Sequence, residues 1–156
     1  MGDQRFIADA MLGKLTKWLR VIGVDVRYDP YGSDRQVLWW ATQEGRIILT
    51  RDRRLGQRCG TAPHLWIASD YYHEQLRQVV QTFGLEHESR LFTRCLRCNT
   101  PLREVAKQAV AGKVPPYVFG TQPAFKHCAA CDRFYWSGTH RDNMGRQLHI
   151  MLGGIR

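Results

Sequence analysis

Two Cys-x-x-Cys pairs are the residues of this chain whose type and spacing point most directly to chemistry. Cys95 and Cys98 form the first pair, Cys128 and Cys131 form the second, and 29 residues separate them. Each pair places two thiolates on one tight turn, and two such turns that face one another form a tetrahedral sulfur cage. Zn²⁺ favours that cage, and structural zinc sites are closed and four-coordinate. We therefore predict that these four cysteines bind zinc.

Other interpretations of the four cysteines stay open from the sequence: two disulfides, a redox pair, or coincidence. A rubredoxin-like iron site would use the same ligands as zinc. The repeated spacing favours zinc, and the absence of a predicted secretory signal before the first predicted strand leads us to expect a reducing, cytoplasmic location. His127 is a rival metal ligand beside Cys128, and Cys59, the fifth cysteine, is expected to be an unpaired thiol.

Four aspartates are the second group, and each follows a predicted strand in the first half of the chain. They are Asp9, Asp34, Asp52 and Asp70. The carboxyl ends of parallel strands share one edge of a sheet, where such folds bind their ligands. Carboxylates gathered at that edge need a cation, and oxygen ligands favour Mg²⁺ or Mn²⁺. This arrangement predicts metal-assisted hydrolysis of a phosphodiester bond.

The alternative is that the aspartates only cap helices, because an Asp before a helix accepts a hydrogen bond from its first turn. Asp34 and Asp70 both precede helical patterns and suit that role. Asp9 and Asp52 each end an apolar strand, which favours the metal site. Asp29 and Glu44 are substitutes within the same cluster.

An alternation of apolar strands and amphipathic helices has to position these aspartates. The predicted strands cover residues 5–9, 24–28, 46–50 and 64–68, and the predicted helices cover 11–22, 34–44 and 72–83. Strands that alternate with helices indicate an α/β fold, here a three-layer domain with a mainly parallel sheet. We place this domain at residues 1–88.

The second half of the chain lacks this alternation and contains prolines at 101, 115, 116 and 123. We expect a short helix within 102–110 and hairpins elsewhere, wrapped on the metal as a small C-terminal zinc ribbon at residues 89–156. No apolar run is long enough to cross a membrane.

The net charge of +9 is concentrated in this second half. Residues 1–89 contain 12 Lys and Arg against 11 Asp and Glu, whereas residues 90–156 contain 11 against 3. A positive field attracts polyanions, and neutralised phosphates supply most of the sequence-independent affinity for nucleic acid. We therefore expect RNA or DNA as the partner of the basic half, in preference to a generic soluble surface.

Blocks along nearly the whole chain, in the same order, resemble the Mut-seven C-terminal RNase family, which joins a PIN-like nuclease domain to a zinc ribbon. The blocks are FIADAMLGKL at 6–15, WLRVIGVD at 18–25, LTRD at 49–52, EQL at 74–76, RCLRCN at 94–99, VPP at 114–116 and YWSGTH at 135–140. The resemblance implies a metal-dependent ribonuclease. Its acidic site would fall on Asp9, Asp34 and Asp52 as magnesium or manganese ligands, with Asp70 as a weaker fourth member.

Residues near these sites are candidates for substrate contact. They are Arg51, Arg20, Thr50, Trp136 and His140. Arginine forks match phosphate geometry, and an exposed aromatic ring stacks on an unpaired base. Four of them also have a structural alternative: Arg51 as a solvated cation, Arg20 as the partner of an acid, Thr50 as a hydrogen-bond partner within its own turn, and Trp136 as a packing residue.

The leading hypothesis is a ribonuclease that acts on single-stranded RNA, with the ribbon holding RNA and the α/β domain cleaving it. A second hypothesis is a non-catalytic protein that binds RNA or a ribonucleoprotein, with the aspartates as caps. A third is a redox or metal-relay protein that uses the Cys-x-x-Cys pairs. The sequence does not identify a protein inhibitor or a ribonucleoprotein partner.

Overall fold

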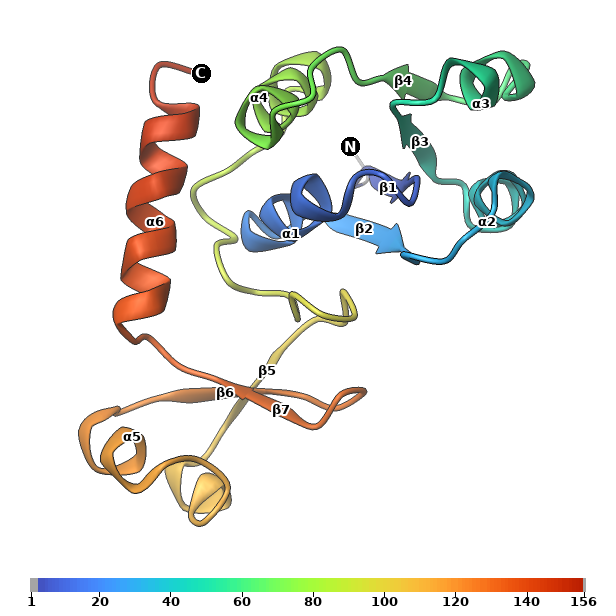
Figure 1. Cartoon of the computed structure of the whole chain (residues 1–156). Coiled ribbons are helices and arrows are strands. Elements are labelled where there is room, and N and C mark those ends of the chain that lie inside the picture. The colour runs from blue at the N-terminus through green and yellow to red at the C-terminus, as the bar shows by residue number, and fades with distance from the viewer. Residues whose placement is uncertain (1–2, 156) are drawn as a thin grey trace. The chain divides into compact units, whose positions relative to one another are not determined.

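The computed structural model describes residues 3–155, and the chain divides into two compact units, Met1–Asn99 and Thr100–Arg156. The strands of the first unit are β1 (Arg5–Ala8), β2 (Asp25–Tyr28), β3 (Ile47–Thr50) and β4 (His64–Trp66) (Figure 1). Its helices are α1 (Gly13–Val21), α2 (Asp34–Glu44), α3 (Arg53–Arg58) and α4 (Tyr72–Phe83).

The four strands form one parallel sheet in the order β2-β1-β3-β4. From β1 the chain moves outward to β2 and then crosses back to β3 and β4. α1 and α4 pack against one another, and the rings of Phe6 (β1) and Phe83 (α4) meet edge to face at 5.1 Å. A separate apolar cluster joins β1 and β3 to α2 and α3: Ile7, Val37, Ala41, Ile48, Leu55 and Cys59. These layers confirm the predicted α/β fold.

Local capping explains why two helices begin and end where the sequence predicted. Ser33 and Gln36 form a reciprocal capping box at the start of α2, and Gly45 ends that helix in the left-handed conformation (φ 62°). Gly84 ends α4 in the same way (φ 61°). Glycine adopts this conformation at no steric cost, so both helices stop at these residues.

The second unit contains a three-stranded antiparallel sheet in the order β5-β6-β7. Its elements are β5 (Arg103–Val105), a 3-10 helix (Lys107–Val110), α5 (Pro116–Thr121), β6 (Phe125–Cys128), β7 (Arg133–Tyr135) and α6 (Thr139–Leu152). The β6–β7 hairpin was predicted, but hairpins were the wrong prediction for 139–152. Met144, Leu148 and Leu152 recur every fourth residue there and form the buried stripe of a helix.

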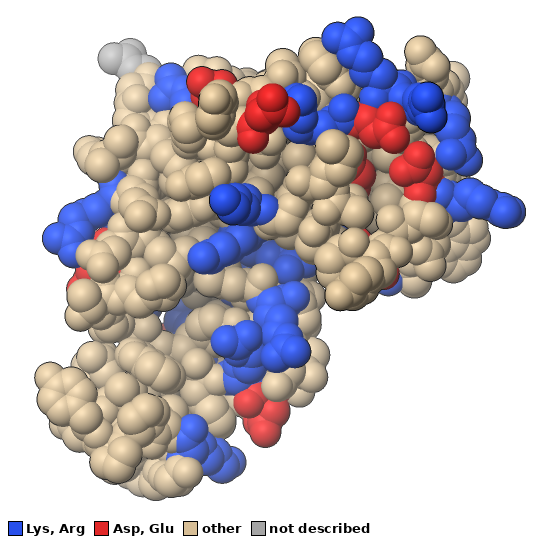
Figure 2. All heavy atoms as spheres, viewed as in Figure 1, with Lys and Arg blue, Asp and Glu red and all other residues tan. Residues whose placement is uncertain are grey.

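On the face seen in Figure 2, Lys and Arg side chains cover more area than Asp and Glu, in line with the net charge of +9. Among residues 3–155, no helix has both the length and the apolar character needed to span a bilayer.

Candidate active site and metal centre

The candidate active site lies at the carboxyl ends of β1 and β3. These strands are neighbours at the centre of the sheet, and their onward connections run in opposite directions. Such a switch point leaves a crevice outside the strand ends, where open α/β sheets bind ligands. Asp9 directly follows β1, and Asp52 follows β3 after one intervening residue.

The Asp9 carboxylate is only 4% exposed, and three donors hold it. Its Oδ1 accepts the backbone N–H of Met11 at 2.9 Å. Its Oδ2 accepts the hydroxyl of Thr50 at 2.5 Å and the backbone N–H of Arg51 at 2.9 Å. A carboxylate oxygen accepts two bonds, so Oδ1 keeps capacity for one further partner.

Thr50 connects the two aspartates. Its side chain is fully buried, and its hydroxyl oxygen accepts the backbone N–H of Asp52 at 2.9 Å while donating to Asp9. Asp52 in turn caps α3, because its Oδ1 accepts the N–H of Arg54 at 2.8 Å. The capping interpretation therefore holds for Asp52, which follows β3, the strand beside β1 in the sheet.

Asp34 and Asp70 have different surroundings. Asp34 is the first residue of α2, yet the cap of that helix is Ser33, and Asp34 lies 3.7 Å from the guanidinium of Arg58. The Asp70 side chain is 82% exposed and pairs with Arg51 at 2.5 Å. Neither residue is the N-cap that the alternative interpretation proposed. Each instead has an arginine partner.

The acidic side chains do not form a preassembled cage. Within residues 3–155, the only His, Cys, Asp or Glu side chains that bring three or more ligand atoms close enough for one ion are four cysteines. The oxygen donors at the sheet edge still fit Mg²⁺ or Mn²⁺, because such ions commonly use one or two carboxylates and complete their shell with water and substrate oxygens. Asp9 and Asp52 are the pair on adjacent strands.

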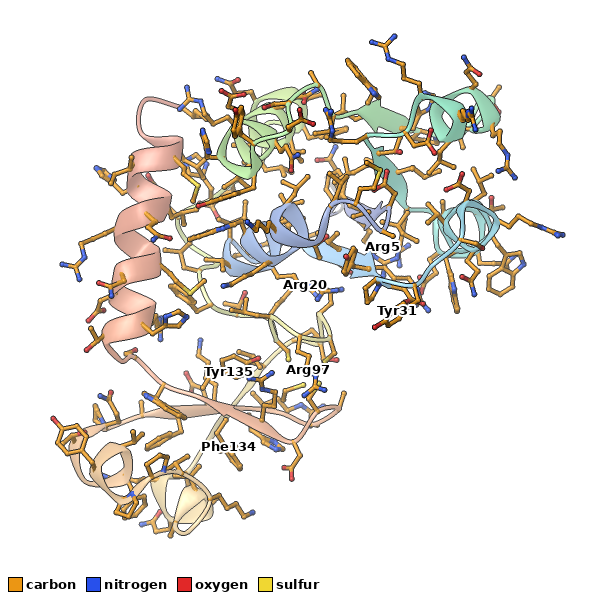
Figure 3. All side chains as sticks on the ribbon, in the orientation of Figure 1. Arg5, Arg20, Tyr31, Arg97, Phe134 and Tyr135 are labelled. Atoms are coloured by element: carbon orange, nitrogen blue, oxygen red, sulfur yellow. The ribbon has the colours of Figure 1, made fainter. Side chains whose placement is uncertain are left out.

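The two predicted arginines serve mainly as connectors. Arg51 donates from Nη1 to the carbonyl of Ile67 at 2.8 Å and holds Asp70 with Nη2, so it joins the ends of β3 and β4. Arg20 is 4% exposed, and its guanidinium donates to the carbonyls of Val26, Leu96 and Arg97. Burial lowers the pKa of Arg20, although arginine remains charged. Its donors are thus committed within the first unit (Figure 3).

Tyr28, at the end of β2, is a residue near the site that the sequence analysis did not select. Its hydroxyl donates to the carbonyl of Ala10 at 2.9 Å, in the segment that follows Asp9. Burial, and the nearby charge of Asp9, raise the pKa of Tyr28. Its position at the carboxyl end of a strand was the signal that would have identified it.

The metal centre consists of the four predicted cysteines. The sulfur atoms of Cys95, Cys98, Cys128 and Cys131 all lie within 4.8 Å of one another. This set of soft donors fits one tetrahedral metal ion such as zinc. The cluster does not include His127, whose Nε2 lies 2.8 Å from a carboxylate oxygen of its neighbour Asp132.

The two cysteine turns share a backbone feature. Asn99 and Asp132, each directly after the second cysteine of a pair, both have positive φ angles, 75° and 53°. Asn and Asp are the residues other than glycine that adopt this conformation most readily. Each turn is therefore built so that the chain reverses immediately after its second thiolate.

Asn99 also attaches the first cysteine turn to the edge strand β2. Its side-chain oxygen accepts the N–H of Val26 at 3.0 Å, and its amide donates to Asp25 at 2.6 Å. Burial opposes the charge of Asp25, but hydrogen bonds from Arg46 and Asn99 outweigh it and lower the pKa of Asp25 below its ordinary value. This role of Asn99 was not predicted from the sequence.

The two candidates in the second unit differ in exposure. Trp136 is half-buried, and its ring meets Phe125 at 6.2 Å between centroids. His140 is exposed at the start of α6. Packing within the second unit therefore accounts for Trp136, whereas His140 is accessible.

Comparisons with known proteins identify the family of this chain. The family model described as the Mut7-C RNAse domain matches residues 4–148. The human protein named "Exonuclease mut-7 homolog" is 35% identical over 101 residues, which is 61% of this chain and 12% of that protein. The chain thus spans about an eighth of that relative's length. No solved structure matches this chain. These findings support a nuclease-type function and confirm the resemblance seen in the sequence: the chain belongs to the Mut7-C RNAse domain family.

Proposed function

We propose that this chain is a metal-dependent ribonuclease that hydrolyses RNA phosphodiester bonds at the carboxyl edge of its parallel sheet. The observation that carries the proposal is the buried Asp9 carboxylate at the switch point, joined to Asp52 through the Thr50 hydroxyl. The family match and the exonuclease relative support the nuclease class.

Asp9 and Asp52 would hold the Mg²⁺ or Mn²⁺ ion, with Asp34 as a third residue at the same edge. Such an ion, when bound, activates water and neutralises charge that develops on the phosphate. Thr50 and the backbone N–H groups of Met11 and Arg51 fix the Asp9 carboxylate in one orientation. Preorganised donors of this kind need not rearrange during the reaction.

Basic side chains beside the edge support a phosphodiester substrate. Arg53 and Arg54 are exposed and directly follow Asp52, and Arg53 is further held over the ring of Trp66 at 4.4 Å. Arg51 uses one N–H of each terminal nitrogen on Ile67 and Asp70, which leaves further N–H groups on its guanidinium. Guanidinium groups are well matched to phosphate oxygens.

We also propose that the cysteine centre holds structural zinc and that the basic second half of the chain binds single-stranded RNA. Residues 90–156 carry 11 Lys and Arg against 3 Asp and Glu, and His140 adds an exposed ring. Arg20 and Trp136 are left out of the proposed RNA contacts because their own units account for them.

A non-catalytic RNA-binding role is the second candidate function. The observations that favour it are the role of Asp52 as the cap of α3 and the lack of a three-carboxylate cluster among the described residues. In that case the acidic edge would stabilise the fold only.

An RNA cleavage assay separates the two candidates. Labelled single-stranded RNA is incubated with the protein, with and without Mn²⁺ or Mg²⁺, and the products are resolved on a gel. We expect cleavage only with the metal, and a loss of about a hundredfold or more for Asp9→Asn and for Asp52→Asn. Asp142→Asn, which removes an exposed acid of α6, is the matched control and should cleave as the wild type does. Full cleavage by both edge variants would reject the site.

A further inference from the structure

A cavity of ≈ 460 Å³ lies along the free edge of β2, in the first unit. Its walls are the ends of β1 and β2, the loop at 29–32, one side of α2, and the cysteine turn at 97–99. We propose that this cavity is a subsite for one nucleotide of single-stranded RNA, with Arg27 under the base and Arg97 on a phosphate. This inference rests on the ribonuclease proposed above, because it concerns how the same substrate is held.

Arg27 and Trp40 form a flat platform in the wall of the cavity. The Arg27 guanidinium lies 3.3 Å from the centre of the Trp40 ring. Its Nη1 lies 3.3 Å from a carboxylate oxygen of Glu44, which fixes it from the side. The Arg27 side chain remains 38% exposed. A guanidinium plane fixed in this way can stack on a nucleobase, as arginine does in single-stranded RNA recognition.

The other arginines that line the cavity differ in how many of their guanidinium hydrogen-bond donors are already used. Arg20 and Arg46 are buried, and their guanidinium groups donate to carbonyls of the first unit, and in the case of Arg46 also to Asp25 and Glu44. Arg97, labelled in Figure 3, is exposed. Among the described residues 3–155, its guanidinium makes no hydrogen bond or ion pair. Its carbonyl, held by Arg20, anchors the backbone from which the side chain extends. Arg97 is therefore the cation available to a phosphate.

The cavity also adjoins the candidate active site. Ala8, the last residue of β1, lines it and directly precedes Asp9. Tyr28 lines it too and bonds to the carbonyl of Ala10 on the other side of Asp9. A nucleotide in the cavity would thus belong to the RNA strand whose phosphodiester backbone passes the carboxyl edge of the sheet. Tyr31 belongs to the loop at 29–32, does not line the cavity, and is 93% exposed.

This arrangement favours an unpaired substrate. The faces of bases in a duplex are covered by their neighbours, whereas single strands present them to aromatic rings and arginine planes. Duplex RNA should therefore gain nothing from the Arg27 platform.

Equilibrium binding of a short fluorescein-labelled single-stranded RNA, followed by fluorescence anisotropy without added Mg²⁺ or Mn²⁺, tests the subsite. We expect Arg27→Ala and Arg97→Ala each to raise the Kd about tenfold. Arg27→Lys should lose nearly as much as Arg27→Ala, since lysine keeps the charge but has no plane to stack. Arg35→Ala removes an exposed arginine of α2 outside the cavity and should change the Kd less than about twofold.

The outcomes of this experiment are independent of cleavage. Wild-type affinity in both alanine variants would overturn the subsite even if the protein cleaves RNA. Weakened binding in both, by a protein that never cleaves, would uphold the subsite and reject the ribonuclease. Full rescue by Arg27→Lys would overturn the stacking role, as would an equal loss of affinity for duplex RNA. Unchanged thermal melting of each variant shows that the fold is intact.

Discussion

The cysteine centre and the acidic edge gather reactive side chains in opposite ways. The four thiolates come as two close sequence pairs, and their sulfur atoms lie within 4.8 Å of one another. The aspartates come singly from separate strand ends, and only Asp9 and Asp52 are joined, through a threonine. Because the cysteine site is built from local turns, its geometry follows from the spacing of the cysteines in the sequence. The positions of the aspartates depend instead on how the strands assemble into the sheet, and the other two aspartates pair with arginines.

The two sites also differ in what holds them together. Asp9 is fixed in one orientation by three hydrogen bonds from protein donors. The four sulfur atoms lie within 4.8 Å of one another, and binding of a metal ion makes such proximity of thiolates favourable. Substitutions at each site test this contrast.

Cys95→Ser tests the metal dependence of the second site. We expect the variant to lose its bound metal and the second unit to lose its ordered structure, because structural zinc contributes roughly 10–16 kcal/mol in small zinc domains. Amide hydrogen exchange should rise in Thr100–Arg156 and stay low in β1 and β3. Elemental analysis of the wild type identifies the ion and distinguishes zinc from iron.

The matched control is Cys59→Ser, which alters a buried thiol outside the cluster. It should keep the metal. Loss of protection in β1 and β3 of Cys95→Ser would show that the two sites are not independent in stability, which would contradict the contrast.

Asp25→Asn removes a carboxylate that stabilises the fold and belongs to neither site. Asp25 accepts from Arg46 at 2.8 Å and from Asn99 at 2.6 Å, and we expect its loss to lower the free energy of unfolding by about 1–3 kcal/mol. Because the pKa of Asp25 is lowered in the folded state, its contribution is present above the ordinary value of 3.8 and is lost as the pH falls through the folded value.

Urea unfolding from pH 7 down to pH 3 measures both effects. The variant should be less stable at neutral pH and should approach the wild type in acid. Asp3→Asn removes an exposed carboxylate that pairs with Arg90, and because solvent screens this pair the substitution should lower stability much less than Asp25→Asn does. A constant difference between wild type and Asp25→Asn across this range would exclude the proposed linkage.

Thr50→Val sharpens the account of the acidic edge. The substitution keeps the shape but removes the hydroxyl between Asp9 and Asp52, and we expect kcat for RNA cleavage to fall about tenfold with little change in KM. Thr50→Ser should restore most of the activity, which a purely structural role would not require.

Thr16→Val serves as the comparison, because it removes an equally buried hydroxyl that donates to the carbonyl of Leu12. It should lower stability by a similar amount and leave kcat unchanged. Equal kcat values for the two valine variants would assign Thr50 a structural role alone.

Much of the fold followed from the sequence because its signals are local. Asp34–Glu44 and Tyr72–Phe83 were predicted to the residue, since amphipathic spacing and a terminal glycine define both helices. α3 was not predicted because it has six residues and buries only Leu55. The predicted helix within 102–110 is instead the strand β5 and one 3-10 turn, because pairing with β6 decides the conformation of residues 103–105.

The candidate sites show the same difference between local sequence signals and contacts between residues far apart in the chain. The cysteine cluster followed from its spacing, and the position of Asp9 and Asp52 at strand ends followed from the alternation of elements. The partners of Arg20 could not be predicted, because Leu96 lies 76 residues further along the chain. The same is true of Arg51 and Asp70, whose pairing depends on how two loops meet in space.

Asn99 and Arg20 both hold the first cysteine turn of the metal centre. Together they bind the backbone of the first cysteine turn to β2, using the N–H and the carbonyl of Val26. We therefore expect the folded α/β unit to present one half of the chelate before the metal ion binds. We expect an incoming ion to be captured first by Cys95 and Cys98 and then to recruit the later pair, so that maturation of the ribbon waits on folding of its neighbour.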